Sequence, residues 1–275
     1  MSLLLKPVPA SHGPRWIVDA FRLYARRPLA FTALFTIFLF AALLVALVPL
    51  LGGLVQMMSL PMLSLGFMVA SQSALLDGPV HPRQFIEPLR GDAARRRSLL
   101  TLCAIYGVAA LIILLVADAV SGHAWERLQQ LMAKGEMDQV QIDALLSEPG
   151  VGLGLVLGTV LVALLSVPFW HAPALVHWGG QGVAQALFSS TLAVWRCRGA
   201  FFTYSLAWVG VMLGFGTLAA LVLALLGVPQ MAGLLGVPAG LVFSAVFYIS
   251  LLFTFNDSFG GAAAAAAEPP ANIRP

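Results

Sequence analysis

Residues 169–201 read FWHAPALVHWGGQGVAQALFSSTLAVWRCRGAF. The segment starts as the end of a long apolar run, which Pro168, Pro173 and the glycines at 179 and 180 interrupt. It continues with the spacing of an amphipathic helix and enters another apolar run after Arg196 and Arg198. Proline and glycine interrupt helices, and basic residues collect on the cytoplasmic side of a membrane. The segment therefore predicts a junction of two membrane spans at that surface, and simpler versions of it occur twice more.

The composition places the chain among integral membrane proteins. Hydrophobic residues make up 60% of the 275 residues and charged residues only 10%, with a mean hydropathy of +0.91. A soluble domain carries about 25% charged residues. The net charge of +3 comes from basic clusters that flank apolar runs, as topology signals do. We therefore expect no nucleic-acid partner.

Six apolar segments are long enough to cross a hydrocarbon core of about 30 Å. They predict an all-α polytopic membrane protein whose six transmembrane helices form three hairpins, each preceded by a cytoplasmic interfacial amphipathic segment. A cytoplasmic tail (1–14) comes before a single membrane domain (15–257), and a disordered cytoplasmic tail (258–275) follows it. The predicted spans cover about 29–51, 54–76, 98–120, 151–176, 199–226 and 231–255.

The basic residues predict the orientation. If the N-terminus is cytoplasmic, thirteen of the fifteen lysines and arginines fall on the cytoplasmic side, and only Arg127 and Lys134 fall in the periplasmic loop (121–149). The positive-inside rule then places both termini in the cytoplasm. The loop is acidic, but its carboxylates lack the spacing of an EF-hand, so we expect a solvated helical hairpin rather than a calcium site.

The first surface segment, residues 15–27, has charged residues on one helical face and apolar residues on the other. Trp16 and Tyr24 are suited to headgroup depth, so the helix is expected in the membrane interface. An ordinary amphipathic helix packed on its own protein explains the pattern equally well. Each odd-numbered span follows such a basic segment, which favours a threefold repeat of surface helix and hairpin.

Several polar residues are candidate ligand or lipid contacts. Arginine clusters can bind anionic headgroups at about 1 kcal/mol per cation, although a pure topology signal is the simpler interpretation. His171 and His177 are six residues apart, so they could share a metal only if the helix breaks at Pro173. We expect a packing role for His171 and an interface role for His177 instead. Neither a metal nor a cofactor is expected. The candidates are His171, His177, Gln72, Gln56, Arg95, Arg96, Arg97, Arg196 and Arg198.

Four segments carry a resemblance: FRLYARRPLAF (21–31), LPMLSLGFMVA (60–70), FWHAPALVHW (169–178) and WRCRGAFFTYSLAW (195–208). Together they resemble a family of uncharacterised proteobacterial multi-span inner-membrane proteins, over about residues 10–257. The layout is more distantly similar to the membrane domain attached to some glycerophosphodiester phosphodiesterases, but no catalytic domain accompanies it. The resemblance implies the inner membrane of a Gram-negative bacterium and no agreed activity.

Catalytic signatures such as a Walker loop, GxSxG, HExxH and CxxC are missing, so we expect no enzyme. Two functions remain. The first is a non-enzymatic protein that binds or organises lipids or partner proteins, with basic surface helices on the anionic inner leaflet. The alternative is a transporter or translocator of a lipid-like or apolar molecule, with a path lined by Gln56, Ser64, Gln72 and His171. Protein partners and homo-oligomers are left open.

Overall fold

The computed structural model describes residues 5–49, 51–124, 127, 130, 144 and 147–260. A helix satisfies its own backbone hydrogen bonds, which apolar segments require in lipid. Within the described residues every regular element is helical, and six segments are long and apolar enough to span a membrane. This confirms the all-α polytopic fold. The helices are α1 His12–Arg26, α2 Pro28–Ala46, α3 Gly52–Leu75, α4 Ala93–Val120, α7 Pro149–Phe169, α8 Ala172–His177, α9 Val183–Arg196, α10 Arg198–Leu225 and α11 Ala232–Phe259, with short 3₁₀ turns η1 Pro82–Phe85, η2 Glu87–Arg90 and η3 Pro229–Met231.

Several helix boundaries differ by a few residues from the predicted spans, and two of the differences involve charged residues or the C-terminal tail. Helix α4 begins at Ala93, five residues earlier than expected, so Arg95, Arg96 and Arg97 belong to the helix itself. Helix α11 continues past residue 257 to Phe259, where Gly260 ends it with a φ of +82°. The predicted start of the disordered tail at 258 is therefore wrong by two residues. The rest of that tail and most of the predicted loop 121–149 lie outside the described residues.

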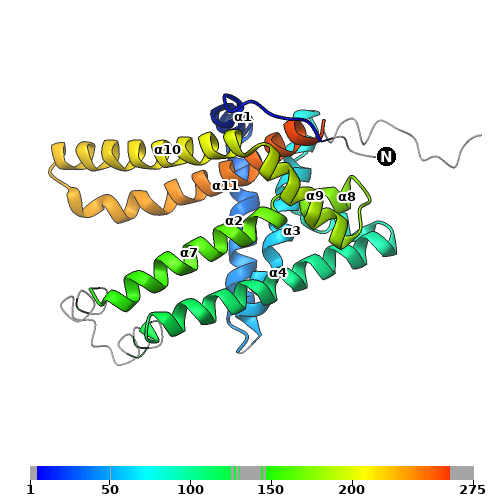
Figure 1. Cartoon of the computed structure of the whole chain (residues 1–275). Coiled ribbons are helices and arrows are strands. Elements are labelled where there is room, and N and C mark those ends of the chain that lie inside the picture. Colours follow the sequence, from blue (N-terminus) through cyan, green and yellow to red (C-terminus); the bar gives the residue numbers. More distant parts are fainter. Residues whose placement is uncertain are drawn as a thin grey trace, which may run out of the picture.

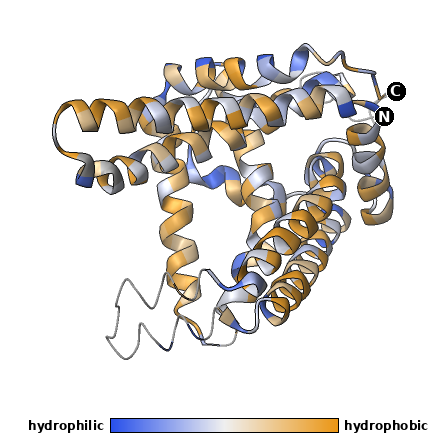
Figure 2. Cartoon of the chain, turned by 60° about the vertical axis from the view of Figure 1, so that its left-hand side comes forward, coloured by the Kyte–Doolittle hydropathy of each residue, from blue (hydrophilic) through white to orange (hydrophobic). Residues whose placement is uncertain are grey.

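The long helices diverge from one end of the molecule. In Figure 1 the α10–α11 pair and the α4–α7 pair run apart toward the left, while α1, α8, α9 and the end of α11 lie near their point of origin. Figure 2 shows apolar residues along most of the length of the spans. We call the shared end the hub and define it as α1, α8, α9, residues 93–102 of α4, residues 198–204 of α10 and residues 245–259 of α11.

Residues 245–259 of α11 form the centre of the hub. Five apolar side chains of this segment have no exposed surface: Ala245, Val246, Ile249, Leu252 and Phe255. They contribute to two apolar clusters, which also contain residues of α1, α2, α3, α4, α8 and α9. Residues 233–238 of the same helix are exposed. The C-terminal half of α11 therefore holds the helices together, and the N-terminal half leaves its surface open.

Helix α1 packs its apolar face on the protein. Trp16 and Ile17 are only 2% and 3% exposed, and they join Phe201 and Tyr204 of α10 in one cluster. Gly13 sits so close to α10 that an added Cβ would lie 2.5 Å from the Tyr204 nitrogen. The side chain of Trp16 is therefore covered by the protein itself. Of the two interpretations of this helix, the structure favours packing on its own protein.

Glycines allow α4 and α7 to approach closely. A Cβ at Gly154 would lie 2.7 Å from the Ala117 oxygen and 2.8 Å from the Ser121 side chain, and one at Gly158 would lie 3.1 Å from Ala117. Gly154 and Gly158 thus let α4 and α7 pack closely, as small residues do between membrane helices.

An ion pair joins the ends of the segment between α4 and α7. Both terminal nitrogens of Arg127 donate to the carboxylate of Glu148, at 2.9 and 2.8 Å. The hydrogen bond from Arg127 lowers the pKa of Glu148 and raises that of Arg127. Because both groups are exposed, the pair adds little to global stability.

Gly154→Leu should destabilise the protein, because the new side chain meets the backbone of α4. Overpacking of this kind costs about 1–3 kcal/mol, or a melting temperature lowered by roughly 3–10 °C. Gly152→Leu, on the same helix with no neighbour within 4 Å of its Cβ position, is the matched control and should leave the melting temperature unchanged. Equal melting curves for the two variants, measured in the same detergent, would contradict the α4–α7 contact.

Candidate functional site

Hydrogen bonds from three aromatic side chains converge on one face of α11. The acceptors Ser250, Thr254 and Asp257 are spaced four and three residues apart, which places them on one helical stripe. Ser250 and Thr254 direct their own protons to backbone oxygens of α11, so their oxygens are available as acceptors. The bonds run from Tyr204 to Ser250 at 2.7 Å, from Trp170 Nε1 to Thr254 at 3.2 Å and from Trp16 Nε1 to Asp257 at 2.7 Å.

Asp257 connects α1 to the end of α11. Its Oδ2 atom accepts from Trp16 and lies 2.8 Å from Nδ1 of His12. A hydrogen bond to an ionised acceptor is about twice as strong as one between neutral groups. Asp257 therefore fixes the position of the N-terminal helix, and with it the arginines on the outer face of that helix.

The break between α7 and α8 is closed by a serine of α9. Pro173 lacks a backbone N–H, and the chain leaves the helix at Trp170 and His171. Ser190 Oγ accepts from the His171 backbone nitrogen at 3.0 Å and donates to the Val167 oxygen at 3.1 Å. Two backbone groups freed by the break are thus satisfied. The neighbours of Ser190 on the buried face of α9 are the small residues Ala186 and Ala193.

His171 lies inside the hub. The side chain has no exposed surface, and the rings of Phe201, Phe255 and Phe259 surround it at centroid distances of 6.0, 5.8 and 5.5 Å. Within the described part of the chain neither ring nitrogen has a hydrogen-bond partner. This position fits the expected packing role, and the hydrogen bonds of His171 to described residues are made by its backbone.

His177 does not join His171 in a metal site. It lies against the ring of Trp178 at 5.5 Å and interacts electrostatically with Arg95 of α4. Among the described residues no three His, Cys, Asp or Glu side chains cluster as a metal site would require. The position beside Trp178 suits an interface residue.

The two candidate glutamines do not form one site. Gln56 and Gln72 are both half-buried on α3. They are sixteen residues apart, which is about 24 Å along a helix. A ligand contacting both would have to lie along the length of α3.

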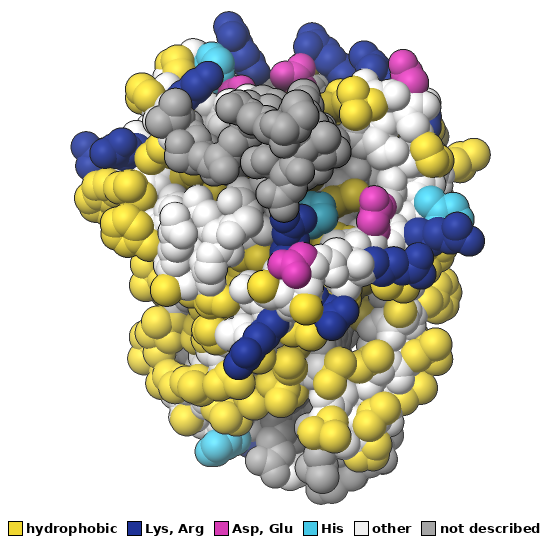
Figure 3. Space-filling view, turned by 90° about the vertical axis from the view of Figure 1, so that its right-hand side faces the viewer, with side chains coloured by type: hydrophobic (Ala, Val, Ile, Leu, Met, Phe, Trp, Pro, Cys, Tyr) yellow, Lys and Arg dark blue, Asp and Glu magenta, His cyan; other side chains and the backbone are white. Residues whose placement is uncertain are grey.

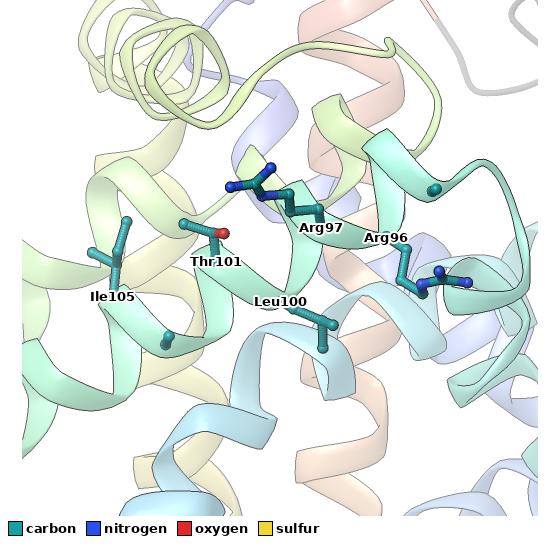
Figure 4. A pocket seen from close by; sticks show the side chains of 7 residues that line it. Arg96, Arg97, Leu100, Thr101 and Ile105 are labelled. Atoms are coloured by element: carbon teal, nitrogen blue, oxygen red, sulfur yellow. The ribbon is translucent and has the colours of Figure 1, made fainter.

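The three consecutive arginines of α4 point in different directions, because successive helical residues differ by about 100°. Arg95 is half-buried near His177, whereas Arg96 and Arg97 are exposed. Figure 4 shows Arg96 and Arg97 extending away from each other. They line an open groove on α4 together with Ala93, Leu100, Thr101, Ala104 and Ile105.

A second exposed basic group lies where α9 meets α10. Arg196 and Arg198 are exposed, and the guanidinium of Arg198 lies 5.6 Å from the ring centre of Trp195. Trp195, Phe188 and Phe202 are 68%, 68% and 69% exposed. Figure 3, which views the hub end, shows lysines and arginines spread among hydrophobic side chains. This mixture is typical of a membrane–water interface.

Sequence reasoning missed three residues with structural roles. Arg27, interpreted as a topology signal, donates to the backbone oxygens of Asp77, at 3.1 Å, and Gly78 beyond the end of α3. Asp257 entered the prediction only as the last residue of the membrane domain, and Ser190 was not singled out. The spacing of Ser250, Thr254 and Asp257 was the one available signal, since it marks a polar stripe on an apolar helix.

Asp257→Ala should loosen α1, because Trp16 and His12 lose their shared acceptor. A lost hydrogen bond to a charged group costs about 1–3 kcal/mol, which lowers the melting temperature by roughly 3–10 °C. Asp257→Asn keeps an acceptor oxygen and should lower the melting temperature by less. Asp19→Ala removes a carboxylate from an exposed pair with Arg22 and serves as the control. Equal losses for Asp19→Ala and Asp257→Ala would contradict the special role of Asp257.

No family model and no solved structure matches the chain. A protein of Burkholderia thailandensis, described as a probable inner membrane protein, is 32% identical over 255 residues, which cover 92% of this chain and 93% of the relative. The distant similarity to the phosphodiesterase membrane domain remains a prediction. With its six candidate spans, the chain belongs to the family of this relative and is a multi-pass inner-membrane protein.

Proposed function

We propose that the chain is a non-enzymatic protein that binds anionic lipid headgroups through the hub, and so organises lipids or partner proteins at the cytoplasmic face. The observation that carries the proposal is the exposure of arginines and aromatic side chains together at the hub. Arg96, Arg97, Arg196 and Arg198 are exposed beside apolar or aromatic neighbours. Each cation near an anionic leaflet contributes about 1 kcal/mol.

The orientation follows from the position of the charges. Helix α1 carries exposed Arg15, Arg22 and Arg26 on the hub, and two arginines at the start of α4 and Arg198 at the start of α10 are exposed as well. Arg127 lies at the other end of α4, beyond Val120. The positive-inside rule therefore supports a cytoplasmic hub and two cytoplasmic termini.

The hub is suited to presenting these charges at a fixed depth. Hydrogen bonds hold α1 to α11, and the buried small residues of α9 bring that helix close to the α7–α8 break. Phe188 and Trp195 of α9 extend outward, where aromatic rings partition to the headgroup level. No observation of the described residues favours the transport alternative: His171, a member of the suggested path, is enclosed by aromatic rings.

Reporter fusions test the orientation. A green fluorescent protein fused after Gly260 should fluoresce, because it folds in the cytoplasm, and alkaline phosphatase fused after Ser147 should be active, because it requires the periplasm. The reverse pattern would place the arginines on the periplasmic side and would overturn the proposal.

Native mass spectrometry from nanodiscs tests lipid binding. The variant Arg96→Gln, Arg97→Gln, Arg196→Gln, Arg198→Gln should retain fewer phosphatidylglycerol molecules than the parent, with phosphatidylethanolamine unchanged, because only the anionic headgroup gains from the cations. Arg127→Gln, at the opposite end, should retain the parent number. Equal phosphatidylglycerol retention by the parent and the fourfold variant would contradict headgroup binding at the hub.

A further inference from the structure

The open groove on α4 combines a cationic end with an apolar floor. Its lining residues recur at three- and four-residue intervals from Ala93 to Ile105, so they form one face of the helix. The groove is wide open along its length and has a volume of about 540 Å³. Along the helix the lining begins with the charged Arg96 and Arg97, continues with the hydroxyl of Thr101, and ends with the apolar Ala104 and Ile105.

The polar end of the groove complements a phosphate. Arg97 and Thr101 are one helical turn apart, and Figure 4 shows the guanidinium of Arg97 and the Thr101 side chain on the same side of α4. Arg96 flanks the other side. A guanidinium and a hydroxyl one turn apart can both donate to one phosphate, and hydrogen bonds to such an anion are the strong ones.

The apolar end continues into the span. Leu100 and Ile105 are 50% and 42% exposed, and Val108 and Ile112 extend the exposed apolar surface along α4. Ile105 lies eight residues beyond Arg97, which is about 12 Å along the helix. A lipid with its phosphate at Arg97 would therefore have its acyl chain beside Ile105, deeper in the membrane. The small side chain of Ala104 leaves the hollow between Leu100 and Ile105 open.

We propose that this groove is a discrete site for one anionic glycerophospholipid, with its phosphate at Arg97 and Thr101 and an acyl chain over Leu100, Ala104 and Ile105. The inference rests on the proposed lipid-binding function and deepens it, since it replaces general attraction to the leaflet by a shaped site. Charge complementarity selects the anionic headgroup, and the apolar floor selects a lipid over a free phosphate.

A charge-neutral double variant tests the site. Thr101→Val, Ala104→Leu removes the hydroxyl and fills the hollow but keeps every arginine. The matched control is Thr217→Val, Ala220→Leu, which makes the same changes at exposed positions of α10. Dioleoylphosphatidylglycerol retained per chain is measured by native mass spectrometry at collision energies that strip loosely bound lipid.

The parent and the α10 control should each hold one phosphatidylglycerol, and the α4 variant should hold it about tenfold more weakly. Equal retention by the α4 variant and the control would overturn the discrete site while leaving general arginine binding intact, provided that the fourfold arginine variant still loses lipid. A parent that retains no phosphatidylglycerol would overturn both proposals.

A second arm separates lipid from free phosphate. sn-Glycerol 3-phosphate added to the detergent-solubilised protein should leave the bound lipid in place, because it has no acyl chain to occupy the floor. Displacement of the lipid at equimolar sn-glycerol 3-phosphate would overturn the assignment of the apolar floor.

Discussion

Hydrogen bonds from aromatic side chains to the C-terminal half of α11 are the interaction on which the rest of the structure depends. Apolar side chains gain little by leaving lipid for another apolar surface, so helices in a membrane associate through close packing and polar contacts. Here Ser250, Thr254 and Asp257 collect donors from α10, from the α7–α8 junction and from α1. One stripe of three side chains thereby sets the position of three separate parts of the chain.

The hub also explains why the molecule is closed at one end and open at the other. Only 6% of an 18-residue apolar stretch of α10 is buried. Gly210, Gly214 and Gly216 of the same helix have open space where a Cβ would lie. Beyond the hub the α10–α11 pair and the α4–α7 pair run apart (Figure 1), and the buried apolar clusters that join the helices lie at the shared end.

The sequence was sufficient for the features that repeat, and insufficient for those that depend on a single partner. Apolar length located all six spans. The burial of Trp16 could not be predicted, because a tryptophan beside arginines suits an interface equally well and the deciding acceptor, Asp257, is 241 residues away. The different exposure of the three arginines of α4 could not be predicted either. Arg95 is half-buried while Arg96 and Arg97 are exposed, because α4 starts at Ala93 rather than at residue 98 and so includes all three.

Distances between spin labels in nanodiscs test whether the hub holds the helices together. With the buried native cysteines replaced by alanine, one pair of labels at Val18 and Phe188 reports on the hub, and another at Leu47 and Leu225 reports on the far ends. All four positions are exposed. We predict a narrow distance distribution for the hub pair and a broad one for the far pair. If the distance distribution of the hub pair were as broad as that of the far pair, the hub would not hold the helices together.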